Sequence, residues 1–464
     1  MEDNRVQKED VVKIISHRPN ISEDILAVAI EALSIVELED ISLRDALHRA
    51  AAQLQVGQEA STREASRLAF ETLNMRDLLD AVLERAVAPA ELEDFTLGIQ
   101  ALLRIFLYTT RISPRPAQPA SLAEIGRRIL GWNDIAPIER TLGRLAAISL
   151  EELVQGRRDN DATALTSHNP VWFTKYATRA LGRTRALKVL FAPRTSNRTI
   201  VRLNPTGLPE ADILKELESR RITLEHVPGV HHVYSVITAK EGLRKEIGSG
   251  LLRLQDLPSS IAVAASSPMP GKSVLFASPL PSSAVTYMAQ FMTGLGSIRV
   301  IGNSQEQLSR VADEASRSKA SPIVETIVAE ESDAVSGCQV DTVMLHAPNS
   351  RTGLFWREPS LKWRTQPDAI EYFTGIQDRL LDIFSKAVRP GGNIAYWTRS
   401  ITIEEDELMI QRFQARHPEF IPSDSLPKIG FPGLRGLTQA QRLFPDPHGC
   451  DGAFIALLTK MDGP

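Results

Sequence analysis

Cysteine is scarce in this chain, and long apolar runs are missing. Only Cys338 and Cys450 occur among 464 residues, too few for a disulfide framework or a cysteine-rich zinc site, so no metal centre is expected. Such scarcity is typical of a reducing compartment. No apolar run reaches the roughly 18 residues that a membrane-spanning helix needs. The first residues are acidic and polar, unlike a signal peptide. The sequence therefore predicts a cytoplasmic protein.

An excess of charge of one sign is also lacking. Lysine and arginine number 53 against 57 acidic residues, a net charge of -4. A global field that would attract a nucleic acid is therefore excluded, and any basic surface must be local. The length allows two or three domains.

The pattern of apolar residues divides the chain. Residues 23–154 show helical periodicity without a strand pattern, and residues 97–108, apolar nearly all round, predict a central buried helix. A small α+β unit is expected at 167–250. Short strands then alternate with helices across 251–464, which predicts an α/β domain with a mostly parallel sheet. The remaining segments are an N-terminal extension, 1–22, and a polar linker, 155–166.

Ligands of such sheets bind beyond the carboxyl ends of the strands. The expected strand ends fall at 276–284, 301–304, 345–353 and 397–401. These four segments are therefore the first place to look for a site.

Motifs along the whole chain resemble the RsmB/Nop/Sun family of RNA cytosine-C5 methyltransferases. The first part is similar to the family's NusB-like domain. Five later segments follow in the family's order: "HNPVWFTKY" (168–176), the Arg202-x-Asn204 strand, "LRLQDLPSS" (252–260), "VRPGGNIAYWTRSITIEEDE" (388–407) and "DGAFIALLTK" (451–460). The resemblance implies an RRM-like, RNA-engaging unit at 167–250 and a Rossmann-type methyltransferase domain at 251–464.

The positions that carry the family's chemistry differ here. The resemblance implies two cysteines and an acid, one thiolate adding to the cytosine ring. In this chain His346 occupies the acid's position, Asn349 the releasing cysteine's, Arg351 a glycine's and Arg399 the nucleophile's. A guanidinium does not add to a pyrimidine at ordinary pH. No catalytic residue is therefore expected at these positions.

The cofactor positions differ as well. The family's glycine-rich loop becomes Phe276 to Ala284, in which Ser282 and Ser283 add side chains, whereas glycines would let backbone N–H groups approach the cofactor. The acid that would bind the ribose falls on Gly302. We therefore expect no cofactor, and S-adenosylmethionine only if the chain proves active.

Three residues leave alternatives open. Cys450 is either a relocated nucleophile or, as we favour, a small buried residue. His346 either hydrogen-bonds a flipped base, or it caps the strand end or fills the vacant cofactor pocket. Arg399 either binds phosphate or pairs internally with Glu404 or Glu405; internal pairing is favoured because an unpaired buried guanidinium is costly.

A basic stretch supplies the argument for RNA. From Asn169 to Pro209 there is no Asp or Glu, whereas cations are interleaved with Trp172, Phe173 and Tyr176, a mixture suited to phosphate contacts and base stacking. The alternative is a solvated helix face with the aromatics in the core. Residues 351–364 are a second basic and aromatic stretch. The predicted RNA-contacting residues are Trp172, Lys175, Arg179, Arg183, Arg185, Lys188, Arg202, Asn204, Arg351, Arg357 and Lys362; Arg194 and Arg198 belong to the same run.

Three functions remain. The favoured hypothesis is a catalytically inactive family member that binds structured RNA, above all ribosomal RNA, in ribosome assembly or as a ribosome-associated factor. The second is an active S-adenosylmethionine-dependent RNA (cytosine-5) methyltransferase with displaced catalytic residues. The third is a scaffold whose NusB-like domain docks a protein partner.

Overall fold

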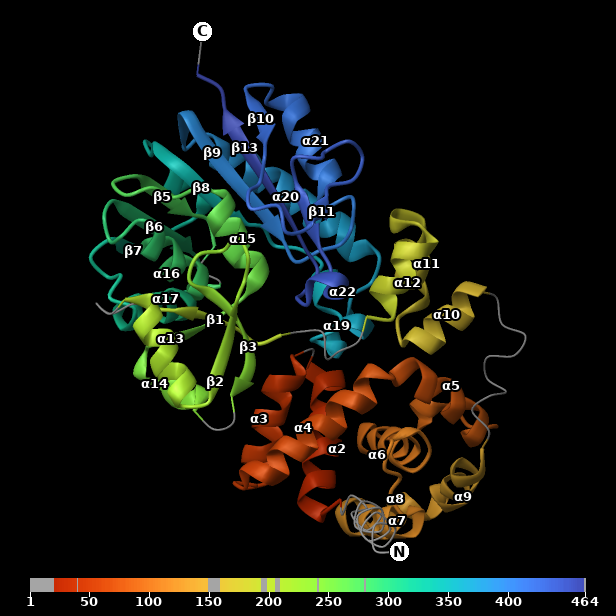
Figure 1. Ribbon diagram of the computed structural model, residues 1–464. Coiled ribbons are helices and arrows are strands. Elements are labelled where there is room, and N and C mark those ends of the chain that lie inside the picture. Colours follow the sequence, from red (N-terminus) through yellow and green to blue (C-terminus); the bar gives the residue numbers. More distant parts are fainter. Residues whose placement is uncertain are drawn as a thin grey trace, which may run out of the picture. The chain divides into compact units, whose positions relative to one another are not determined.

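The computed structural model describes residues 21–39, 41–148, 159–192, 198–204, 209–239, 242–278 and 281–462. The chain forms two compact units, most of whose elements are labelled in Figure 1. The first contains the residues up to Ala186 together with Glu358–Arg364. The second contains Leu187–Arg357 and the residues from Thr365 onward. The predicted Arg194 lies outside the described residues, as do residues 155–158 of the expected linker. The rest of that linker was predicted wrongly, because residues 159–166 belong to helix α10 (Asp159–Ser167).

The first unit is helical, as predicted. Its elements include α2 (Glu23–Glu39), α3 (Leu43–Gln53), α4 (Glu59–Asn74), α5 (Arg76–Val87), α6 (Leu97–Leu107), α7 (Pro119–Leu130), α8 (Trp132–Ile135), α9 (Glu139–Ala147), α10 (Asp159–Ser167) and α11 (Val171–Leu181). The prediction of a central buried helix over 97–108 is confirmed, since α6 is buried from Ile99 to Leu107. This burial includes Arg104, whose guanidinium is neutralised by Asp80 at 2.6 Å and Glu37 at 2.5 Å.

One element of the helical unit comes from far along the chain. This is α19 (Pro359–Arg364). Lys362 Nζ donates to Asn74 Oδ1 at 2.7 Å and to the carbonyl of His168 at 3.0 Å. Trp363 Nε1 donates to the carbonyl of Leu73, near the end of α4, at 2.8 Å. Because carbonyls in a helix's last turn lack intrahelical donors, α19 supplies hydrogen bonds that α4 cannot make alone.

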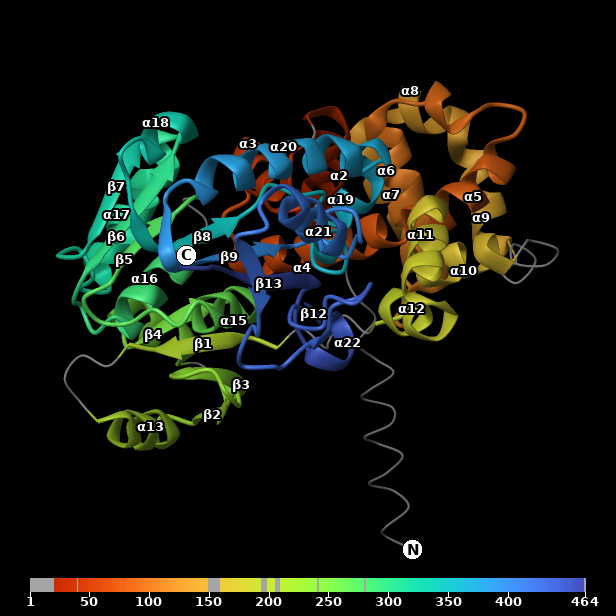
Figure 2. The same ribbon diagram turned by 90° about the horizontal axis from the view of Figure 1, so that it is seen from above.

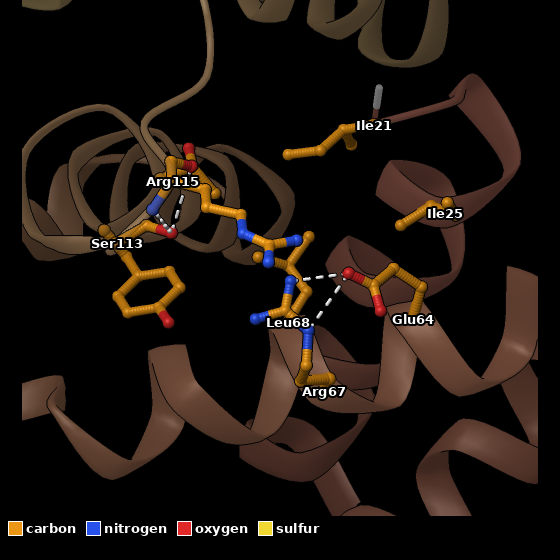
Figure 3. A pocket seen from close by; sticks show the side chains of 9 residues that line it. Ile21, Ile25, Glu64, Arg67, Leu68, Ser113 and Arg115 are labelled. Carbon is orange, nitrogen blue, oxygen red and sulfur yellow. Dashed lines mark hydrogen bonds and ion pairs between the residues drawn. The ribbon is translucent and has the colours of Figure 1, made fainter. Parts of the chain in front are cut away.

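A pocket between α2, α4 and the segment after α6 is too small for a ligand. Figure 3 shows Ile21, Ile25 and Leu68 on its wall, beside the ion pair of Glu64 with Arg67 at 2.5 Å. Its volume is about 10 Å³, which is room for about one water molecule.

The second unit contains a small antiparallel sheet, order β2-β3-β1-β4. Its elements are β1 (Ile200–Leu203), α13 (Glu210–Ser219), β2 (Ile222–His226), β3 (Val233–Ala239), α14 (Leu243–Ser249) and β4 (Leu252–Gln255). Val201 and Leu203 pack in one apolar cluster with Ile213 and Leu217 of α13. The alternate residues of β1 point to the other face, where Ile200 joins the core of the larger domain.

The larger sheet has the order β11-β12-β13-β9-β8-β5-β6-β7, with β10 paired to β13. Its strands are β5 (Ser273–Phe276), β6 (Ser297–Gly302), β7 (Val324–Val328), β8 (Val340–His346), β9 (Val388–Thr398), β10 (Phe420–Ser423), β11 (Phe431–Pro432), β12 (Gln441–Leu443) and β13 (Ala453–Lys460). Strands β5 to β9 pair in parallel, and β13 joins β9 antiparallel. The prediction of a mostly parallel Rossmann-type sheet is confirmed.

Helices cover both faces of this sheet. One face packs against α15 (Leu257–Ala265), α16 (Ser282–Phe291) and α17 (Gln305–Arg317). The opposite face packs against α20 (Asp368–Ser385) and α21 (Glu407–Arg416), as Figure 2 shows. The remaining helices are α12 (Arg183–Leu190), α18 (Glu331–Val335) and α22 (Pro445–His448). The order of the strands reverses at β5 and β8, so a ligand of this fold would bind beyond their carboxyl ends.

Candidate functional site

Three aromatic rings meet where the parallel strands end. His346 ends β8 and is paired in register with Trp397 of β9. Its imidazole stacks on the Trp397 indole, with ring centroids 4.8 Å apart and planes 17° apart. Phe276, which ends β5 and is buried, meets the same indole edge-on at 5.7 Å. Of the two roles left open for His346, the stack favours packing at the strand end.

The loop after β8 is held by its own hydrogen bonds. Asn349 Nδ2 donates to the carbonyl of Ala347 at 2.7 Å, and Asn349 Oδ1 accepts from the backbone N–H of Arg351 at 3.0 Å. This Asx turn supports Arg351 in a left-handed conformation, φ 59°. Asn349 is buried and shapes the loop.

A buried carboxylate joins the loops after β8 and β9. Glu405 is fully buried and accepts hydrogen bonds from the hydroxyls of Ser350, Ser400 and Thr402 at 2.5 to 2.7 Å. Gln377 of α20 also donates to it, at 3.3 Å. Sequence reasoning considered Glu405 only as a partner of Arg399 and missed this role. Hydroxyl residues in both loops were the available signal.

Arg399 lies in a buried ion-pair network. Its guanidinium pairs with Asp256, the N-cap of α15, and with Asp451 at 3.1 Å. Burial alone would raise the pKa of Asp256, but the adjacent guanidinium holds that pKa below its ordinary value. The two carboxylates in turn raise the pKa of Arg399 against the effect of burial. Internal pairing was predicted correctly, whereas the expected partners, Glu404 and Glu405, were wrong.

Neither cysteine has the environment of a nucleophile. Cys450 and Cys338 are both buried. Burial, reinforced by Asp451 and Asp256, raises the pKa of the Cys450 thiol well above its ordinary value. Because the thiolate is the reactive species, this environment favours the interpretation of Cys450 as a packing residue.

The strand ends do not fit S-adenosylmethionine. β6 ends at Gly302 and is followed by Asn303, where an adenosine ribose would need a carboxylate. At β5 the side chain of Phe276 is packed against Trp397. Ser282 and Ser283 form the first turn of α16 and Ala284 is buried. We therefore assign no role in cofactor binding to these residues.

Three of the predicted RNA contacts lie inside the protein, which corrects those predictions. Arg202 is fully buried; it donates to Thr286 Oγ1 at 2.8 Å and lies over the ring of Tyr287 at 5.4 Å. Burial lowers the pKa of Arg202 to about 10, so it stays charged at neutral pH. Asn204 Nδ2 donates to the carbonyl of Gly250 at 3.1 Å. Lys362 is the buried residue of α19 that bonds Asn74.

The remaining predicted contacts are accessible to solvent. Arg357 is exposed and pairs with Asp451 at 2.8 Å, and Arg351 is exposed on the loop after β8. The accessible residues of α11 and α12 are Lys175, Arg179, Arg183 and Lys188, which are exposed, and Trp172 and Arg185, which are partly buried. Phe173 and Tyr176 face the core. For these two aromatics the structure therefore favours packing in the core over stacking on RNA bases.

Two classes of site find no support in the described part of the chain. No helix there is long and apolar enough to cross a membrane. Nor does it contain a group of three or more His, Cys, Asp or Glu side chains arranged to hold a metal ion.

Comparison with known proteins identifies the family. Residues 263–459 match the model of the 16S rRNA methyltransferase RsmB/F family. The chain is 24% identical over 404 residues to a probable ribosomal RNA small subunit methyltransferase B of Bacillus subtilis, covering 85% of this chain and 89% of that protein. Residues 263–459 therefore belong to a methyltransferase domain of the RsmB/F family.

Other family members match over different lengths. The 26S rRNA (cytosine-C(5))-methyltransferase nsun-1 of Caenorhabditis elegans is 24% identical over 277 residues, 56% of this chain and 42% of that protein. Several further relatives, each named ribosomal RNA small subunit methyltransferase B, are matched over about half of their length. The chain is thus homologous to rRNA cytosine-C5 methyltransferases.

A solved structure shares the fold over nearly the whole chain. The crystal structure of PH0851 superposes with a TM-score of 0.77, 21% identity, and coverage of 96% of this chain and all of the other. At this identity the likeness concerns the fold, and the side chains at the strand ends have to be judged on their own contacts.

Proposed function

We propose that this chain is a catalytically inactive family member that binds ribosomal RNA, in ribosome assembly or as a ribosome-associated factor. The observation that carries the proposal is Arg399. It stands at the position of the family's nucleophile, and its guanidinium is neutralised by Asp256 and Asp451. A charged, paired guanidinium offers neither a lone pair nor a proton-accepting group for attack on a base.

The neighbouring contacts support the same conclusion. Asn349 closes a turn and His346 stacks on Trp397, so the positions of the releasing cysteine and of the acid serve packing. β6 ends at Gly302, where binding of an adenosine ribose would need a carboxylate. An active enzyme with displaced residues would need Cys450, whose buried environment disfavours the thiolate.

RNA binding is supported by the exposed cations. Lys175, Arg179 and Arg183 are exposed on α11 and at the start of α12, within the stretch that resembles the family's RNA-engaging segment. Exposed lysine and arginine neutralise phosphates and release counterions, which gives affinity for RNA that decreases with salt. Ribosomal RNA is proposed because the similar curated proteins are named for it.

Two assays on the full chain test the proposal. Incubation with methyl-labelled S-adenosylmethionine and total cellular RNA is expected to transfer no label, and crosslinking in cells followed by sequencing is expected to recover ribosomal RNA. The matched variant for the second assay is Lys175→Glu/Arg179→Glu, with Arg310→Glu on α17 as a control at another exposed cation. The first variant should lose the crosslinks and the control should keep them. Label at cytosine carbon 5, or crosslinks that survive the first variant, would contradict the proposal.

A further inference from the structure

Acidic residues of α10 contact the cations proposed to bind RNA. The first turn of α10 carries Asp159 and Asp161. Asp159 pairs with Arg183 through both carboxylate oxygens, one of them at 3.2 Å from the guanidinium. Asp161 Oδ1 lies 3.5 Å from Lys175 Nζ. Two of the three cations named above are therefore paired with carboxylates of a single helical turn.

We infer that the first turn of α10 is an internal competitor for RNA phosphate. Its two carboxylates occupy Arg183 and Lys175, so RNA has to displace them before its phosphates contact these cations. The inference rests on the proposed RNA binding and specifies which carboxylates weaken that binding.

The exposure of the pairs makes displacement feasible. The side chains of Arg183 and Asp159 are 62% and 65% exposed, and those of Lys175 and Asp161 are 56% and 31% exposed. Exposed ion pairs contribute little to stability because water screens both charges, so a polyanion that offers several phosphates at once outcompetes them. An isolated phosphate gains little from such an exchange. The restraint therefore favours dense phosphate arrays, such as folded RNA, over single phosphate groups.

Arg179 provides an internal contrast. It lies on the same helix as Lys175, and its guanidinium is 5.9 Å from the ring centroid of Tyr176. A cation over a ring keeps its full charge and can still contact phosphate. Arg179 is thus available for a first contact, whereas Arg183 and Lys175 engage once the carboxylates are displaced.

The test measures RNA affinity as a function of salt for the full chain and for Asp159→Asn/Asp161→Asn. Fluorescence anisotropy with a labelled rRNA fragment is suitable, and circular dichroism checks folding. The double variant should bind about two- to tenfold tighter at low salt. A plot of log K for RNA binding against log salt concentration should be steeper for the double variant. The slope should increase by up to about 0.7 for each side chain, Arg183 or Lys175, that no longer pairs with a carboxylate. The control is Asp212→Asn/Glu218→Asn on α13, which removes the same charge elsewhere.

A double-mutant cycle localises the effect. Asp159→Asn should strengthen binding in the wild-type background and leave it unchanged in the Arg183→Ala background. If the wild type binds RNA and the Asp159→Asn/Asp161→Asn variant binds no more tightly, the inference is overturned while the proposed function stands. An equal gain in affinity in the α13 control would have the same consequence. Absence of RNA binding by the wild type and all variants would overturn the proposed function as well.

Discussion

Arg399, in the loop after β9, and the arginines of α11 and α12 differ in what surrounds their guanidinium groups. Arg399 is 7% exposed and its charge is balanced by Asp256 and Asp451. Arg183 is 62% exposed and pairs with Asp159, whose carboxylate is also exposed to water. In the first region a guanidinium links parts of the fold, and in the second it can exchange partners. Basic residues in a sequence therefore indicate RNA only where their side chains remain in solvent.

The largest expected effect is that of Arg399→Ala. Removing this guanidinium leaves Asp256 buried without its ion-pair partner, and a broken buried pair costs about 3–5 kcal/mol. Urea unfolding of the full chain should show a loss of that size. Arg357→Ala is the matched control, because Arg357 pairs with the same Asp451 from a half-exposed position; its cost should stay within about 1 kcal/mol. Equal losses in the two variants would remove the distinction between a buried and an exposed guanidinium.

A buried carboxyl of the helical unit predicts a dependence on pH. Burial raises the pKa of Asp77 to about 8, against 3.8 for the free group. The folded state then binds the proton more tightly, so this contribution to stability is complete below about pH 4 and is lost as the pH rises towards 8. His168, whose pKa burial lowers to about 4, acts in the opposite direction, but only below about pH 6.5.

Asp77→Asn should therefore remove a loss of stability between about pH 6.5 and 8. In this window the wild type should lose up to roughly 1.4 kcal/mol per pH unit, and the variant should lose less. Urea unfolding at several pH values measures the difference. Asp212→Asn, at an exposed position, is the control and should follow the wild type. Parallel curves for the wild type and Asp77→Asn would contradict the assigned pKa.

Sequence patterns predict the helices and strands of this fold better than they predict which charged side chains pair with one another. The apolar residues of α6 and the alternation of strands and helices after residue 260 depend on local periodicity, and both were predicted. Arg202 and Arg183 belong to the same acid-free run, yet one is buried and the other exposed. The sequence did carry a local signal for the burial of Arg202. It stands between Val201 and Leu203, and a nearly continuous apolar run is typical of a buried strand. The partners of Arg399 come from distant segments, and periodicity carries no information on such pairs.

Lys362→Met is expected to have an intermediate effect on stability and none on RNA. The side chain is buried, and its Nζ donates hydrogen bonds to Asn74 Oδ1 and to the carbonyl of His168. Both acceptors lose this donor in the variant. An unmet buried hydrogen bond costs about 1–3 kcal/mol, to be read from urea unfolding. RNA affinity of the folded variant should equal that of the wild type in anisotropy titrations. A drop in affinity at unchanged stability would return Lys362 to the RNA-contacting set.

Arg179→Gln should show the opposite behaviour, with the smallest change in stability. Arg179 is exposed and its guanidinium lies over the ring of Tyr176, so the free energy of unfolding should change by less than about 0.5 kcal/mol. Loss of one phosphate contact should weaken RNA binding and make its salt dependence shallower by about 0.7 in log K against log salt. Titration at several salt concentrations measures both. Weaker binding with an unchanged salt slope would point to base stacking in place of phosphate contact, because stacking releases no counterion from the RNA.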